Sequence, residues 1–455
     1  MSKTKKHIHT HTKTKKNIHI YGKIIHNNQE GWKVIHIYGD SYERGFAHGV
    51  LLVKDLHRVC KSFPFIIKQQ FDIPFKTFLK VCKTIISPII KLQYQEIYYE
   101  LQGISQGAKY AGCNISIDYL IAWNSILGMS EYFENDNQQK IQRCSAFIAT
   151  GDATETGEIV MAHNTHGDMV SNSFFNIQMY VTPDKGFPFV MQTAAGFVAS
   201  GTDWFISSSG MIGCETTISD IKYKPQFNKQ INGGHPYFCR IRNAMQYGEN
   251  LNDYAKIMTE NNAGDCANSW LFGDIRSNEI MLCEIGLKTH NIQRTKNGLY
   301  YGMNSPHSFK LRNEETNDNE YYDMNTSSGA RNTRLNALLN IKYYGKINIT
   351  NAKDILSDHY DVFIDTIQPN SHTICIHTYL DGRDESEFYP HKACDGKVVD
   401  STMAYKMSFQ AKWGSSCNIP FNVETYIKKH PEYNDWKNHM INLPNKEWIN
   451  IHLKK

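Results

Sequence analysis

The 455-residue sequence predicts an α+β protein on three observations. Apolar residues recur at helical spacing from about residue 50 to 130, and short β-rich runs separated by Gly, Asn and Asp begin at Cys144. A helical pattern returns over residues 236–260, and a last set of strands with one helix follows "SHTICIHTYL". The order helices, sheet, helices, sheet fits a layered α+β architecture. With 41% apolar and 21% charged residues, the chain can bury the core of one large domain or of two ordinary ones.

The first 23 residues differ in charge from the rest of the chain. They hold seven Lys and four His but no acidic residue, which predicts a disordered basic tail over 1–23. A nucleic-acid arm or a metal-binding His tract is the alternative, but the tail lacks interleaved aromatic residues and a fixed His spacing. No apolar h-region follows the basic start, and the longest apolar runs are far shorter than the roughly 20 residues of a membrane span. We expect a soluble protein without a signal peptide or transmembrane segment, and the compartment stays open.

Residues 24–143 are predicted to form a mostly helical N-terminal part. "WKVIHIYGDSYERGFAHG" indicates a strand, a turn at Gly39-Asp40, and a helix that begins at Ser41 with Glu43 in its first turn. Gly45 and Gly49 lie four residues apart on one face of that helix, which allows a neighbour to approach closely. Three further runs with helical spacing then follow.

Residues 144–455 are predicted to form the sheet-rich part. "CSAFIATGDATETGEIVMAHNTHGD" indicates a hairpin that begins at Cys144 and turns between Gly151 and Gly157. A second hairpin is expected in "NSWLFGDIRSNEIMLCEIG". In simple register, the end of the first hairpin's return strand lies beside Cys144. The polar residues there are His163, Asn164, Thr165, His166 and Asp168.

Cys144 at the start of a strand has two interpretations, a small buried hydrophobe or a nucleophile. The eleven Cys residues include no Cys-x-x-Cys pair, which indicates neither a zinc site nor a dense disulfide scaffold. Most are expected to be buried hydrophobes, and a pair such as Cys394 with Cys417 could be bridged in an oxidising compartment. No metal and no organic cofactor is expected.

Several segments resemble, in order from about residue 33 to 430, the phospholipase B-like proteins and the related peptidase C45 acyltransferase group. They include "GDSYERGFAHG", "CSAFIATGD", "VMAHNT", "ISSSGMIGCETTI", "NSW" and "DGKVVDSTMAYKMSFQAKWG". These families are N-terminal-nucleophile (Ntn) hydrolases. The resemblance implies a four-layer αββα sandwich over 144–455, preceded by the helical section.

The resemblance also implies that the Arg143–Cys144 bond is cleaved autocatalytically, which frees the α-amine of Cys144. An α-amine has a pKa of about 7.7 to 8 and a thiol one of about 8.5, so the amine is a plausible proton acceptor for the thiol. One residue would then be both nucleophile and base. If residues 1–143 stay bound, the mature form is a heterodimer of two fragments.

The resemblance assigns the remaining catalytic and binding roles to single residues, and each of these residues also has a purely structural interpretation. Asn268 matches the side-chain amide that stabilises an oxyanion, and otherwise it is a turn Asn. Arg331 matches an Arg that steadies the site, with Arg334 as its rival and a surface Arg as the alternative for both. Thr216 matches a segment that crosses the Cys strand, and Trp270 would suit an acyl chain or the core.

The C45 branch places an Asp three residues after an Arg where this chain has His163 and His166. The "HNT" form of the cluster, with Asn164 and Thr165, instead favours the phospholipase B-like branch. His163 is expected to orient the α-amine or the substrate carbonyl, or else to be structural. The role of Asp168 stays open.

Three functions fit these features. The first is a hydrolase of acyl amide or ester bonds, with a small-molecule acyl amide or lipid as substrate and a thioester on Cys144 as intermediate. The second is a C45-type acyltransferase that passes the acyl group to an amine, and the third is a non-catalytic scaffold of the same fold. A papain-like protease would place its Cys at a helix N-terminus, so a Cys that begins a strand disfavours it. No nucleic-acid partner is expected.

Overall fold

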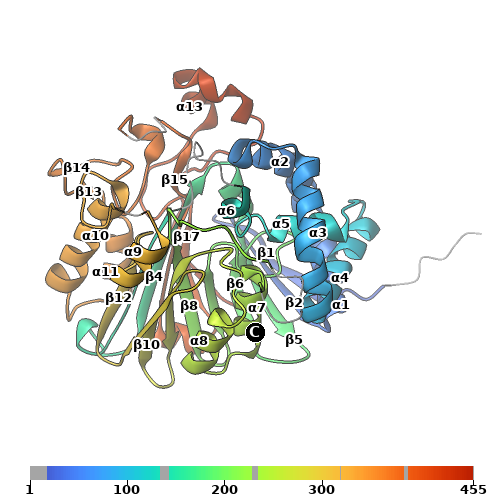
Figure 1. The fold of residues 1–455 in the computed structure, drawn as a ribbon, viewed down its shortest axis with the longest axis horizontal. Coiled ribbons are helices and arrows are strands. Elements are labelled where there is room, and N and C mark those ends of the chain that lie inside the picture. The colour runs from blue at the N-terminus through green and yellow to red at the C-terminus, as the bar shows by residue number, and fades with distance from the viewer. Residues whose placement is uncertain (1–17, 134–142, 228–233, 318, 384–387, 454–455) are drawn as a thin grey trace, which may run out of the picture.

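Two large β-sheets and the helices around them build the protein (Figure 1). The computed structural model describes residues 18–133, 143–227, 234–317, 319–383 and 388–453. Most of the expected basic tail therefore lies outside the described residues. The first strand begins at Gly22, two residues before the predicted start of the helical part at residue 24.

The nine-stranded sheet has the order β1-β2-β5-β6-β7-β8-β9-β10-β11. Its neighbours are antiparallel except β2 and β5, which are parallel, so the N-terminal part contributes two strands to a sheet of the C-terminal part. Its strands are β1 (Gly22–Gln29), β2 (Trp32–Gly39), β5 (Ile177–Pro183), β6 (Phe189–Thr193), β7 (Trp204–Ser207), β8 (Met211–Thr217), β9 (Asn268–Asp274), β10 (Glu279–Ile285) and β11 (His290–Thr295).

The seven-stranded sheet has the order β12-β3-β4-β16-β17-β18, with β15 paired to β4. Its β3–β4 hairpin places Cys144 opposite Thr165, and the β9–β10 hairpin lies in the other sheet, so both predicted hairpins are confirmed. The strands are β3 (Arg143–Thr150), β4 (Val160–Asp168), β12 (Gly298–Gly302), β15 (His391–Ala393), β16 (Asp395–Asp400), β17 (Phe409–Trp413) and β18 (Ile449–Ile451); β13 (Tyr360–Asp361) and β14 (Thr366–Ile367) pair separately.

The helices confirm the helical section and the later helical pattern. The first group is α1 (Ser41–Leu51), α2 (Val53–Phe71), α3 (Phe75–Gln93), α4 (Gln95–Ala111), α5 (Ile117–Asn124) and α6 (Ser130–Phe133). The later ones are α7 (Tyr237–Tyr247), α8 (Leu251–Thr259), α9 (Phe309–Glu315), α10 (Ser327–Ala337), α11 (Ile349–Leu356), α12 (Ser401–Tyr405) and α13 (Val423–Lys429). Within the described ranges, none of these helices combines the length and apolar character needed to cross a bilayer.

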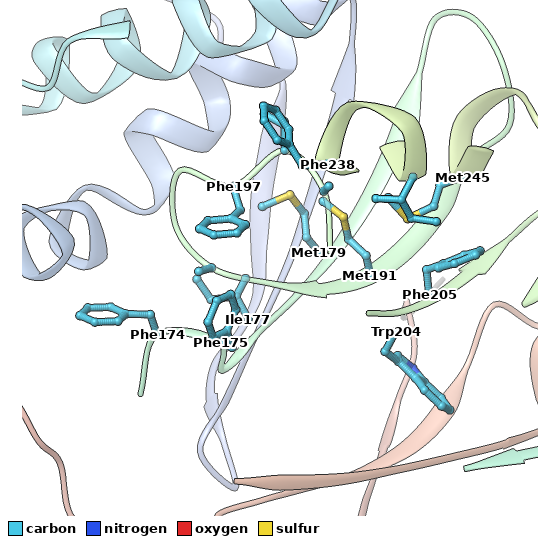
Figure 2. Packing of buried hydrophobic residues seen from close by; sticks show 14 of the residues in the cluster. Phe174, Phe175, Ile177, Met179, Met191, Phe197, Trp204, Phe205, Phe238 and Met245 are labelled. Atoms are coloured by element: carbon cyan, nitrogen blue, oxygen red, sulfur yellow. The ribbon is translucent and has the colours of Figure 1, made fainter. Parts of the chain in front are cut away.

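Side chains that alternate along the strands divide the core in two. Ile148 of β3 lies against Gly273 of β9, so this face of the seven-stranded sheet packs on the nine-stranded one. The opposite face of β3, including Phe147, packs on residues of α10 and α11. In Figure 2, Trp204 and Phe205 of β7 point to opposite sides of the nine-stranded sheet. Phe205 faces the helix side, where it stacks on Tyr254 of α8 at 5.8 Å. The prediction of a mixed α+β protein is confirmed.

Helices α1 and α4 pack backbone to backbone at glycines. The Asp40 side chain accepts from the Glu43 N–H at 2.8 Å, and Glu43 accepts from the Asp40 N–H at 2.9 Å, which forms the capping box that starts α1. A Cβ atom on Gly45 would lie 2.1 Å from the Glu100 carbonyl oxygen, and one on Gly49 would lie 2.2 Å from that of Ile104. The expected close neighbour of this glycine face is therefore α4.

A buried ion network joins this helical pair to α7. The Glu100 carboxylate accepts from Arg44 Nε at 2.7 Å and from Arg242 Nη2 at 2.8 Å, and all three side chains are almost fully buried. Burial alone would raise the pKa of Glu100, but Arg242 and Arg44 outweigh it and lower the pKa to about 2. The network is thus a charged contact between the N-terminal part and the sheet-rich part.

Candidate active site around Cys144

Cys144 is the second residue of β3, and its side chain is 6% exposed. It shares a face with Ala146 and Ile148, so the thiol points toward the nine-stranded sheet. Thr165 lies directly opposite on β4, and His163 is the diagonal neighbour on the same face. Lys397 of β16 pairs with His163. The hairpin and the next strand thus bring a hydroxyl, an imidazole and an ammonium group to the side of the thiol.

Two side chains from outside the hairpin hold the backbone of Cys144. Its N–H donates to Asn304 Oδ1 at 2.9 Å, and its carbonyl accepts from Arg331 Nη1 of α10 at 2.7 Å. The Asn304 amide also donates to the Thr217 carbonyl of β8 at 2.8 Å, and the two bonds together define its orientation. Asn304 therefore bridges β3 to the other sheet.

Lys397 is a fully buried cation beside the thiol. Its ammonium group donates to Thr165 Oγ1 at 2.7 Å and lies 3.1 Å from Asp395 Oδ1. Asp395 in turn accepts from the Thr165 N–H at 3.0 Å and from Gln192 Nε2 at 2.8 Å. Burial lowers the pKa of Lys397, and Asp395 opposes that shift. This pair links the strand opposite Cys144 to β16 and β6 by charge-assisted hydrogen bonds.

The Cys144 thiol is protonated in this arrangement. Burial raises its pKa well above the usual range, the Glu215 carboxyl group raises it further, and Lys397 acts against the rise. Nucleophilic attack by this sulfur therefore needs a nearby proton acceptor.

His163, the diagonal neighbour of Cys144 on the same face of the hairpin, has one unprotonated ring nitrogen. Its Nε2 lies 2.9 Å from the Glu215 carbonyl, which can only accept, so Nε2 carries the proton. Nδ1 has no hydrogen-bond partner among the described residues. Burial, with a smaller contribution from Lys397, lowers the pKa of His163 well below its usual value, so the ring is neutral. A neutral ring with a bare Nδ1 is a proton acceptor.

A carboxyl pair lies on the helix side of β8. Burial raises the pKa of Glu215 well above its usual value, and the hydrogen-bonded Asp203 raises it further. Asp203 also accepts a hydrogen bond from the Tyr237 hydroxyl of α7. Strand alternation places Glu215 on the face opposite to Thr216, so the pair affects Cys144 by charge and not by contact.

The structure brings Arg331, His163 and Thr165 to Cys144, and Thr216 of β8 faces the same space between the sheets. A Cβ atom on Gly302 of β12 would lie 2.3 Å from Thr216 Oγ1. Arg334, the rival of Arg331, instead forms an ion pair with Asp358 at 2.6 Å.

Four other predicted residues are directed elsewhere. Asn164 lies on the opposite face of β4, where its amide donates to the Leu356 carbonyl at 2.7 Å. Asp168 accepts from the N–H groups of Val170 and Ser171 in a turn. Trp270 stacks on Phe272 with ring centroids 5.1 Å apart, on the helix side of β9, where it is a core residue. Asn268 shares that face, and its amide donates to Cys266 Sγ at 3.3 Å.

The cysteines are free thiols throughout the described residues. Cys394 and Cys417, named above as a conceivable bridge, have different neighbours. Cys394 Sγ lies 3.3 Å from the Lys392 carbonyl, and Cys417 Sγ lies 3.3 Å from His377 Nε2.

The residues that sequence reasoning missed are Asn304, Lys397 and Asp395. A Lys within the apolar run "KVV" was the available signal for Lys397.

Comparison with known proteins gives distant matches. No family model matches the chain. An uncharacterised protein of Archaeoglobus fulgidus is 26% identical over 256 residues, which is 53% of this chain, and the match spans 41% of that protein's length. Two crystal structures of variants of conjugated bile acid hydrolase from Clostridium perfringens align with 8% and 7% identity and TM-scores of 0.36 and 0.31. These alignments cover 59% and 70% of this chain and 89% and 90% of those chains.

Proposed function

We propose that the protein is a self-processing cysteine hydrolase of the Ntn type that cleaves acyl amide or ester bonds through a thioester on Cys144. The observation that carries this proposal is the set of contacts that neighbouring residues make with Cys144. Asn304 binds the N–H that would become the α-amine, Arg331 binds the carbonyl, and the thiol faces the space between two sheets. The two sheets with their helices would form the four-layer αββα sandwich of this class.

We propose that cleavage of the Arg143–Cys144 bond proceeds in two steps. The Cys144 sulfur attacks the Arg143 carbonyl carbon, an S–C bond forms, and the C–N bond breaks. The thiol proton passes through His163 Nδ1 to the departing nitrogen of Cys144. Water then hydrolyses the thioester, which leaves a carboxyl group on Arg143 and a free thiol and amine on Cys144.

In the mature protein the α-amine of Cys144 acts as the general base. Asn304 Oδ1 accepts one N–H of the amine and turns its lone pair toward the thiol. The thiol proton moves to the amine, the sulfur attacks the acyl carbonyl, and the amine returns the proton to the departing nitrogen or oxygen. Arg331 positions the backbone of the nucleophile. Asn268 lies on the helix side of β9, so it would have to turn into the space between the sheets before its amide could donate to the oxyanion.

The N-terminal part is proposed to stay bound as the partner fragment after cleavage. Two features support this: β2 pairs with β5 from Lys33 to Gly39, and the carboxylate of Glu100 lies between Arg44 and Arg242. The substrate class, a small-molecule acyl amide or a lipid of the phospholipase B-like kind, rests on the motif resemblance. Transfer of the acyl group to an amine would use the same thioester, and a scaffold without catalysis would leave the bond intact.

Intact-mass spectrometry of the purified full-length protein tests the proposal. Scaling 52.4 kDa by 143 of 455 residues gives fragments of about 16 and 36 kDa, the larger one beginning at Cys144. We expect wild type and Cys60→Ser to split there and Cys144→Ala to stay whole, since Cys60 lies on α2, outside the site. A wild-type chain that stays whole from neutral pH to mild acid would favour the scaffold. For the split form, release of free fatty acid without an added amine distinguishes hydrolysis from acyl transfer.

A further inference from the structure

Four metal-ligand side chains converge at a place that the Cys144 chemistry does not use. His359, Cys375, His377 and Cys417 each offer one nitrogen or sulfur, and these four atoms all lie within 4.8 Å of one another. Cys375, His377 and Cys417 are buried, and His359 is partly buried. The cluster lies between the segment that follows α11 and the loop that follows β17.

The spacing of these atoms is that of a tetrahedral zinc site. With Zn–S bonds of about 2.3 Å and Zn–N bonds of about 2.0 Å, a tetrahedron puts sulfur and nitrogen ligands about 3.5 Å apart. His377 Nε2 lies 3.5 Å from Cys375 Sγ and 3.3 Å from Cys417 Sγ. The two imidazole rings meet edge to face at 5.1 Å, which leaves room for one ion between them.

Two independent observations point to a ligand at this place. The buried Nε2 of His359 has no hydrogen-bond partner among the described residues, so the site does not satisfy it without an added group. The N–H of Ile419 donates to Cys417 Sγ at 3.4 Å, as backbone donors often do to the sulfur of a metal-bound thiolate. Lys392, fully buried, donates to the Ile419 carbonyl at 3.1 Å and holds the same loop.

We propose that His359, Cys375, His377 and Cys417 bind one Zn²⁺ ion in a closed Cys₂His₂ site. Four protein ligands leave no open position for water or substrate, which makes the ion structural and not catalytic. The absence of a Cys-x-x-Cys pair hid the site in the sequence, because only Cys375 and His377 are close along the chain. The expectation of no metal is thereby revised by this proposal.

The proposed ion would stabilise the face of the β3–β4 hairpin that points away from the Cys144 thiol. Asn164 of β4 donates to the carbonyls of Leu356 and Ile374, which lie just before the ligands His359 and Cys375. Ser416, next to Cys417, donates to the same Leu356 carbonyl at 2.6 Å. The zinc site thus connects to the strand whose other face carries His163 and Thr165, and it gives Asn164 a supporting role.

Elemental analysis of the full-length protein, grown with zinc and dialysed without chelator, tests the proposal. We expect about one zinc per chain in wild type and in Cys60→Ser, and less than a tenth of that in Cys375→Ser. His359→Gln, which changes a ligand at the partly exposed edge, is a second variant that should lose zinc even if Cys375→Ser misfolds. All variants keep the His-rich N-terminal residues, so zinc bound there cancels in the comparison.

Cobalt substitution gives a readout that is independent of activity. Co²⁺ in a tetrahedral Cys₂His₂ site gives visible ligand-field bands and a near-ultraviolet thiolate charge-transfer band, which a histidine-only site lacks. We expect both in wild type and neither in Cys375→Ser. A folded wild-type protein without stoichiometric metal or this spectrum, or one with a Cys375–Cys417 disulfide in non-reducing mass spectrometry, would overturn the proposal. None of these outcomes depends on cleavage at Cys144.

Discussion

Replacing Glu100 with Gln should weaken the junction between the N-terminal part and the sheet-rich part. The carboxylate lies between the buried guanidinium groups of Arg44 and Arg242; in Glu100→Gln, Arg242 loses its charged partner and Arg44 keeps only the partly exposed Glu96. Removing one member of a buried ion pair costs about 3 to 5 kcal/mol, because the remaining charge stays buried without compensation. Glu96, which also pairs with Arg44 but is 32% exposed, is the matched control, and Glu96→Gln should cost below about 1 kcal/mol.

The pKa of Glu100 gives a second estimate of this effect. Folding lowers that pKa from 4.5 to about 2. A shift of this size corresponds to about 3 kcal/mol of stability at neutral pH. Because the folded pKa is the lower one, this stability is present above about pH 4.5 and is lost as the pH falls toward 2. The two estimates agree.

Urea unfolding in the uncut Cys144→Ala background measures both quantities without interference from cleavage. We expect Glu100→Gln to lower the free energy of unfolding by about 3 kcal/mol at pH 7 and to flatten its fall between about pH 4.5 and 2. A cost below about 1 kcal/mol at pH 7, with an acid limb like that of the parent protein, would refute the reasoning. In the cut protein, the same change should let the fragments separate at lower urea.

Two further predictions concern backbone contacts. Asn304→Ala removes the acceptor of the Cys144 N–H, so self-cleavage, followed on gels, should slow at least tenfold. The control Asn340→Ala, at an exposed position, should cleave at the wild-type rate. An unchanged rate in Asn304→Ala would exclude the positioning role. Gly45→Ala puts a Cβ atom 2.1 Å from the Glu100 carbonyl oxygen, so thermal unfolding should show a loss of about 1 to 3 kcal/mol in stability. The control Tyr42→Ala, at an exposed position on the same helix, should change the stability little. Equal melting temperatures of Gly45→Ala and wild type would contradict the close packing of α1 on α4.

Local patterns in the sequence were sufficient for much of the fold. The capping box at Asp40 and Glu43, the helical section and the β3–β4 hairpin are each set by residues a few positions apart, where periodicity and turn chemistry act. The pairing of Cys144 with the polar end of β4 followed from simple hairpin register. The glycine face of α1 was also readable, although its partner α4 was not.

Side-chain direction and distant contacts limited the prediction of the site. The cluster at the end of β4 was treated as one group, but a strand alternates, so His163 and Thr165 share the face of Cys144 while Asn164 faces away. The sequence left Trp270 open between a substrate contact and the core, because a buried aromatic residue has the same composition signal in both, and in the structure it stacks on Phe272.

The sequence by itself determined that a strand and a hairpin follow from about Cys144 and which residues that hairpin presents, because those features depend on neighbours in the chain. Only the tertiary structure decided what holds that residue and what surrounds it. Asn304, Arg331 and Lys397 reach Cys144 from 160, 187 and 253 residues away. His359, Cys375 and Cys417 likewise meet through sheet and loop packing. Contacts of this separation come from the packing of whole elements, and no periodicity within one segment encodes them.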